Sequence, residues 1–139
     1  MAKPIRIILD TNWYVSASFN KNSRQLLYNL FNNKSVVVFL SDEILNEYIK
    51  VIKRAKFRSL ITDDLIERFL IVIFTKTEKI ERKTNFEGSR DPKDNFLIAL
   101  SIDNEVDFLV TGDKDLLILG KIGATQIITL TEFFDNHAS

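Results

Sequence analysis

The sequence contains no cysteine and only one histidine, His137, in 139 residues. Without cysteine the chain forms neither disulfides nor thiolate metal sites, and this composition agrees with a reducing compartment. A single histidine near the end of the chain argues against Ser-His-Asp catalysis and against zinc sites built from several histidines. We expect His137 to be solvated.

Net charge and long apolar runs are absent as well. Nineteen basic and nineteen acidic residues cancel, so a nucleic-acid partner would have to be recognised by a local basic patch. No stretch of 18 apolar residues occurs, and the N-terminus leads directly into a strand-like segment without the features of a signal peptide. We therefore expect a soluble, cytoplasmic protein that does not enter a membrane.

The apolar residues, 45% of the chain, alternate between strand-length runs and helical patterns. This length and composition predict one domain over residues 1–139, and no internal repeat is visible. The expected strands are 5–9, 35–40, 77–82, 107–111 and 126–128. The expected helices are 13–19, 23–32, 42–57, 62–74, 92–104, 114–119 and 131–136. This alternation predicts an α/β sandwich around a mostly parallel sheet.

Four acidic residues occur where such a fold binds ligands. Asp10 and Asp113 directly follow predicted strands, and Glu47 and Asp94 belong to helices that begin just after loops. In an open parallel sheet, ligands bind at the carboxyl ends of the strands, so one edge of the sheet could receive all four. Carboxylates about 4 Å apart repel each other by about 4 kcal/mol at an effective dielectric near 20. Such a cluster needs cations or protons.

The donor set indicates which cation. Oxygen ligands without histidine or cysteine select hard ions, Mg²⁺ or Mn²⁺. Metal-assisted hydrolysis of phosphodiester bonds suits such a site, because it needs no side-chain nucleophile. Thr11, Asn12 and Ser41 could donate hydrogen bonds that orient the carboxylates or a water molecule.

Each acid also has a purely structural interpretation. Asp91 and Asp94 could form a capping pair, Asp113 could cap the next helix, and Asp115 could serve the first turn of that helix. Glu47 could lie on a solvated helix edge, although it is closer to the apolar face than Glu43. Asp10 is the hardest to explain in this way, because a carboxylate at the end of a buried strand is costly to desolvate without a partner.

A basic segment follows Glu47. Its cations have two interpretations, as phosphate contacts for RNA or as complements to the C-terminal end of a helix dipole. The candidate RNA-contacting residues are Lys50, Lys53, Arg54, Lys56 and Arg58.

Four segments in this order resemble the PIN domain. They are Ile8-Leu9-Asp10-Thr11-Asn12, Leu45-Asn46-Glu47-Tyr48, Asp91-Pro92-Lys93-Asp94-Asn95 and Thr111-Gly112-Asp113-Lys114-Asp115. The resemblance spans residues 5–134 and is closest to the single-domain toxins of prokaryotic toxin-antitoxin systems, the VapC-like ribonucleases. Any one segment is a weak signal, whereas the ordered set is specific.

The resemblance implies a three-layer α/β/α sandwich with a central, mostly parallel five-stranded sheet. It also implies an endoribonuclease dependent on Mg²⁺ or Mn²⁺, frequent homodimers and an antitoxin protein as partner. The family's catalytic and metal-binding positions fall on Asp10, Glu47, Asp94 and Asp113, with Asn12 near the site and Asp115 as an auxiliary residue. Trp13 and Tyr14 depart from the family, which usually has small or aliphatic residues there.

Two other classes of function compete with a nuclease. A non-catalytic PIN-like module that binds RNA or protein is disfavoured because all four acids are present. A phosphotransfer domain, either receiver-like or an aspartyl phosphatase, requires a pair of acids after the first strand or a second aspartate two positions after the nucleophile. Asp10 stands alone after its strand and Asn12 occupies the second position, which argues against both.

Overall fold

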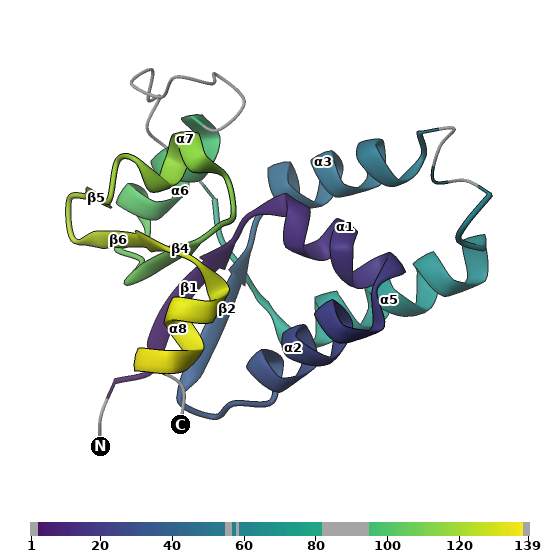
Figure 1. Ribbon diagram of the computed structural model, residues 1–139, viewed down its shortest axis with the longest axis horizontal. Coiled ribbons are helices and arrows are strands. Elements are labelled where there is room, and N and C mark those ends of the chain that lie inside the picture. The colour runs from purple at the N-terminus through teal and green to yellow at the C-terminus, as the bar shows by residue number, and fades with distance from the viewer. Residues whose placement is uncertain (1–2, 55–56, 58, 82–94, 138–139) are drawn as a thin grey trace.

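A mixed six-stranded sheet forms the centre of the computed structural model, which describes residues 3–54, 57, 59–81 and 95–137 (Figure 1). The strands lie in the order β3-β2-β1-β4-β6-β5, and all neighbours are parallel except β5 and β6. They are β1 (Ile5–Leu9), β2 (Val36–Leu40), β3 (Glu78–Lys79), β4 (Phe108–Val110), β5 (Lys121–Ile122) and β6 (Thr125–Ile128). The expected parallel strands are confirmed, and β5 is an additional antiparallel edge strand.

Helices flank this sheet and give the predicted α/β sandwich. In Figure 1, α1, α2, α3 and α5 gather on one side of the strands, and α6 and α7 lie on the other. Their bounds are α1 (Thr11–Phe19), α2 (Lys21–Phe31), α3 (Asp42–Ile52), α5 (Asp63–Lys76), α6 (Asn95–Asp103), α7 (Lys114–Leu117) and α8 (Leu130–Asn136). Within the described ranges, no helix is long and apolar enough to cross a membrane.

The central strand β1 explains why the core is so apolar. Ile7, Ile8 and Leu9 are fully buried, because β1 is hydrogen-bonded to β2 on one side and to β4 on the other and is covered by helices on both faces. A parallel strand in this position reads as a continuous apolar run rather than an alternating one.

The parallel register brings several strand ends to one edge of the sheet. Leu9 pairs with Val110, and Val110 pairs with Ile128. The residues that follow β1, β2 and β6 are hydrogen-bonding side chains that cap the next helix: Asp10 caps α1, Ser41 caps α3 and Thr129 caps α8. This edge therefore concentrates polar side chains directly above the apolar core.

Some predicted boundaries were wrong. The helix expected over 42–57 ends at Ile52, where Lys53 is the C-cap, so only part of the basic segment is helical. The strand expected over 77–82 consists of two residues. The helix expected over 92–104 is present as α6 from Asn95, and its predicted capping residues Asp91 and Asp94 lie outside the described residues.

The two aromatic residues that depart from the family pattern pack inward. Tyr14 is fully buried in α1, and Trp13 packs against the core while remaining partly exposed. Burial raises the pKa of the Tyr14 phenol well above its ordinary value. The Tyr14 hydroxyl has no hydrogen-bond partner among the residues that the structure describes. Tyr14 thus fills space in the core at the cost of one unsatisfied polar group.

Candidate metal site at the carboxyl ends of the strands

Asp10 lies at the centre of the polar edge and is only 5% exposed. Its backbone N–H donates to the carbonyl of Val110 at 2.9 Å, which continues the pairing of β1 with β4. The Asn12 N–H donates to Oδ1 at 3.2 Å, and the Thr111 hydroxyl donates to Oδ2 at 2.7 Å. Both oxygens of a nearly buried carboxylate are therefore held in fixed directions.

The surroundings of Asp10 nevertheless disfavour its charge. Burial is the largest cause and raises the pKa of Asp10, the hydrogen bonds from Thr111 and Asn12 lower it in part, and the charges of Asp113 and Glu47 raise it further. Since charge interactions weaken with distance, these last two effects indicate that Asp113 and Glu47 lie near Asp10. A cation in this region would offset both the cost of burying the Asp10 charge and its repulsion by Asp113 and Glu47.

Asp113 is connected to Asp10 through Thr111, which is fully buried at the end of β4. The Asp113 N–H donates to the Thr111 hydroxyl oxygen at 3.0 Å, and the same hydroxyl donates to Asp10. Oδ1 of Asp113 accepts the Asp115 N–H at 2.8 Å and so caps α7. The capping role predicted for Asp113 is confirmed, and Asp115 takes part through its backbone.

Glu47 reaches the same region from α3. Ile44 and Tyr48 on this helix are buried in the core, and Glu47 beside them is half-buried. This position agrees with the prediction that Glu47 lies at the edge of the apolar face. The sheet edge and α3 therefore bring together Asp10, Glu47 and Asp113 from segments more than thirty residues apart in sequence.

The predicted set is not complete within the described residues. Asp94, Lys56 and Arg58 lie outside them. Across 3–54, 57, 59–81 and 95–137, no group of three or more histidine, cysteine or acidic side chains could hold a metal ion. The carboxylates that the structure does describe offer only hard oxygen donors, which suits Mg²⁺ or Mn²⁺.

The predicted supporting residues have mixed outcomes. Asn12 is exposed and contacts Asp10 through its backbone N–H. Ser41 accepts the Ile44 N–H at 3.2 Å as the cap of α3. The Thr11 hydroxyl is buried and has no hydrogen-bond partner within the described part of the chain. Sequence reasoning gave Thr111 no role, although its position at the end of a buried strand, two residues before Asp113, was a usable signal.

The described part of the basic segment is accessible to a ligand. Lys50 lies in the last turn of α3, Lys53 and Arg54 follow it, and all three are exposed. None of them forms a salt bridge with another described residue. The helix-dipole interpretation holds for Lys50, which lies in the last turn, and contact with phosphates is sterically open to all three.

Comparison with known proteins agrees with this architecture. A family model described as the PIN domain matches residues 6–115. The chain is 30% identical over 118 residues to the uncharacterized protein MJ1680 of Methanocaldococcus jannaschii, covering 83% of this chain and 75% of that protein. A chain of the crystal structure of VapBC2 from Rickettsia felis bound to a DNA fragment from their promoter has a similar fold, with a TM-score of 0.57 and 17% identity over 88% of this chain and 97% of that chain.

Proposed function

The chain belongs to the PIN domain family, and from this membership and the acidic sheet edge we propose that it is a divalent-metal-dependent endoribonuclease with one PIN-like domain over residues 1–139. PIN domains are generally nucleases that use divalent metals. One observation carries the proposal for this chain. Asp10 is nearly buried at a strand end, and burial first, then the charges of Asp113 and Glu47, raise its pKa. An arrangement that disfavours its own charge is explained if a cation completes it.

The proposed catalytic and metal-binding residues are Asp10, Glu47, Asp94 and Asp113. When bound, Mg²⁺ or Mn²⁺ would lower the pKa of an attacking water and stabilise the charge of an in-line displacement. The chain would contribute orientation: Thr111 and the Asn12 N–H fix both oxygens of Asp10, and the Asp115 N–H fixes Oδ1 of Asp113. Asn12 and Asp115 are thus auxiliary residues that act mainly through their backbone.

The proposed substrate is RNA, contacted by the basic segment at the end of α3. Lys50 and Arg54 are exposed within it, and cations of this kind bind phosphates without reading the bases. Exchange of both for glutamine should weaken RNA binding and reduce the slope of log affinity against log salt by about one for each phosphate that these cations neutralise. An unchanged slope would contradict this assignment.

The proposed biological role is that of a cytoplasmic toxin neutralised by an antitoxin protein. The support is the fold shared with a chain of the VapBC2 structure and the four ordered motifs. An antitoxin would have to cover the acidic edge, and a basic side chain inserted beside Asp10 would relieve the same repulsion as a metal ion. Antitoxin and metal should therefore compete.

A non-catalytic PIN-like module that binds RNA or protein is the alternative function. The two functions differ in one measurable property, the affinity for divalent cations in the absence of any partner.

Calorimetric titration of Mn²⁺ separates them. The native protein should bind Mn²⁺, and Asp10→Asn and Asp94→Asn should bind it at least tenfold more weakly. Asp135→Asn, which changes an exposed acid on α8, should bind like the native protein. Equal binding by all four proteins would contradict the assigned site. No binding by the native protein, with or without an RNA oligonucleotide, would favour the non-catalytic module.

A further inference from the structure

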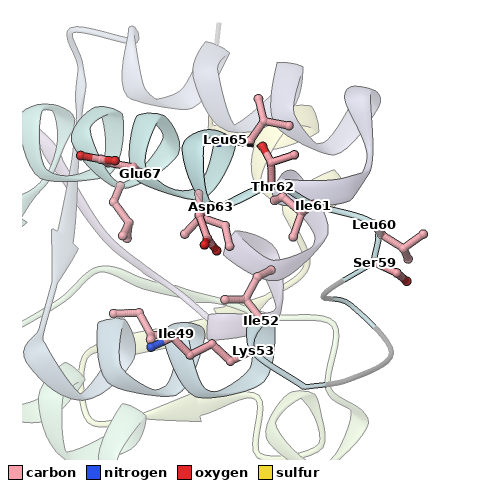
Figure 2. Close-up of a pocket in the computed structure, with 12 residues that line it drawn as sticks. Ile49, Ile52, Lys53, Ser59, Leu60, Ile61, Thr62, Asp63, Leu65 and Glu67 are labelled. Carbon is pink, nitrogen blue, oxygen red and sulfur yellow. Dashed lines mark hydrogen bonds between the residues drawn. The ribbon is translucent and has the colours of Figure 1, made fainter.

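Two hollows on the described surface differ in their charge. The groove between α3 and α5 has Lys53 at the end of α3, and Asp63 and Glu67 on α5 (Figure 2). Charges of both signs favour no ligand of one charge. A second pocket lies at the edge of the sheet where β1, β4 and β6 begin, and its lining has more cations than acids. This second pocket therefore indicates a class of ligand, an anion.

The second pocket is separate from the acidic edge. It adjoins the first residue of β1, whereas Asp10 follows the last residue of that strand. At roughly 3.3 Å per residue, the two ends of β1 are about 13 Å apart. The pocket has a volume of about 510 Å³, which is in the range of sites for small organic ligands. Its apolar lining consists of Pro4, Ile5, Phe108 and Ala124. A small ligand that has an apolar part therefore suits it.

Two cations and one acid line this pocket. Lys3 is exposed and forms no salt bridge with another described residue. Nε of Arg6 lies 3.8 Å from Oδ2 of Asp107, and the same oxygen accepts the backbone N–H of Arg6 at 2.9 Å. Asp107 thus keeps the Arg6 side chain beside the pocket, and its charge offsets only one of the two cations. The positive charge that is left suits a phosphate, which arginine can bind through two parallel N–H groups.

An aromatic ring lies at the same pocket. His137 is exposed, as expected, but its ring is not isolated, because its centroid lies 4.5 Å from that of Phe108 and 5.9 Å from that of Phe133. Phe108 and Phe133 are buried and pack edge to face. The imidazole therefore extends a buried aromatic pair to the surface of the pocket. Nucleic-acid bases stack on histidine as they do on other aromatic side chains, and any base can do so because every base has a π-face.

A nucleotide combines an anionic group with a planar ring, and this pocket offers a contact for each. We propose that the pocket binds a nucleoside monophosphate, with the phosphate between Lys3 and Arg6 and the base on the His137 imidazole. Gln126, which also lines the pocket and is exposed, can donate to and accept from the edge of the base. Inorganic phosphate would leave the apolar lining and His137 unused, and an uncharged ring would leave both cations unused. The site needs neither the metal nor the acidic edge.

Proton NMR of the imidazole tests the site directly, because the chain has only one histidine and its ring signals need no further assignment. Adenosine monophosphate is titrated into the full chain at constant pH without divalent metal. The His137 ring signals should shift and saturate. Adenosine and inorganic phosphate should each bind at least about tenfold more weakly, because each supplies only one of the two contacts. Absence of a saturable shift with adenosine monophosphate, or equal binding of all three probes, would overturn the proposal.

Variants then separate the two contacts. Lys3→Gln and Arg6→Gln should each weaken binding of adenosine monophosphate at least about fivefold and leave binding of adenosine unchanged, because each removes a charge that only the phosphate contacts. Lys76→Gln, which changes an exposed cation outside the pocket, should bind like the native protein. By calorimetry, His137→Phe should bind within about threefold of native and His137→Ser much more weakly, since only phenylalanine keeps a ring for stacking. Lys3→Gln and Arg6→Gln variants that bind like Lys76→Gln would overturn the phosphate contact, and a serine variant that binds like native would overturn the stacking.

Discussion

Replacement of Thr111 by valine exchanges one hydroxyl, which lies between Asp10 and Asp113, for a methyl group. The hydroxyl donates to Oδ2 of Asp10 at 2.7 Å and accepts from the Asp113 N–H at 3.0 Å. Valine has nearly the same shape, so no cavity is created in a position that is 0% exposed. The effect on stability therefore comes almost entirely from two hydrogen bonds.

The magnitude follows from the kinds of bond removed. A hydrogen bond to a charged group contributes about 1.5–3 kcal/mol and a neutral one about 0.5–1.5 kcal/mol. Their sum predicts a decrease of about 2–4.5 kcal/mol in the free energy of unfolding. At roughly 3 °C per kcal/mol for a domain of this size, Tm should fall by about 6–14 °C. Thr111→Ser keeps the hydroxyl and should be destabilised much less.

The pH dependence identifies the bond to Asp10. The Thr111 hydrogen bond lowers the pKa of Asp10, so it stabilises the ionised carboxylate and should matter most at pH values above that pKa. The destabilisation caused by Thr111→Val should therefore shrink as pH falls through the pKa of Asp10. Urea unfolding at neutral and acid pH measures both effects. Equal destabilisation of the valine and serine variants, or an effect of valine that is independent of pH, would refute the reasoning.

Other perturbations test the same interior. Asp10→Asn should raise the free energy of unfolding of the metal-free protein at neutral pH, because burial raises the pKa of Asp10 and its charge therefore opposes folding. This increase should vanish at acid pH, where native Asp10 is protonated. Urea unfolding that gives the same increase at both pH values would contradict this. Tyr14→Phe should raise Tm slightly, because it removes a buried hydroxyl without a partner among the described residues. Tyr48→Phe should instead lower the free energy of unfolding by about 1 kcal/mol, because the Tyr48 hydroxyl is hydrogen-bonded to Ser18 at 2.7 Å. Thermal melts in which Tm shifts in the same direction for both tyrosine variants would contradict these predictions.

Much of the fold was predictable because its signals are local. The runs Ile5–Leu9 and Val36–Leu40 are mostly apolar and rich in β-branched residues, and each is followed by a residue that caps a helix. Such signals determine both the type of element and its end. The strand β5 was missed because it has two residues, placed between Gly120 and Gly123, which both have positive φ. Two glycines so close together predict a turn, and a two-residue strand between them has no sequence pattern of its own.

What sequence reasoning could not find depends on contacts between distant segments. Thr111 bonds to a carboxylate 101 residues away, and no local pattern reports that partner. The end of α3 at Ile52 is a second case, since the residues beyond it continue an apolar helical pattern, yet the chain turns at Lys53. On either side of it, Ile49 of α3 and Ile66 of α5 line a common pocket.

Capping and metal binding compete as interpretations of Asp10 and Asp113 when the sequence is read alone, but in the structure one role supports the other. Each acid caps a helix by accepting a backbone N–H with its Oδ1 atom. A cap fixes the rotamer of the carboxylate at no cost to its second oxygen. In Asp10 that second oxygen is held by Thr111, and the same hydroxyl fixes the backbone of Asp113. Capping is therefore the means by which these strand ends present two carboxylates in fixed directions, and disruption of the cap should weaken Mn²⁺ binding even where the carboxylate remains.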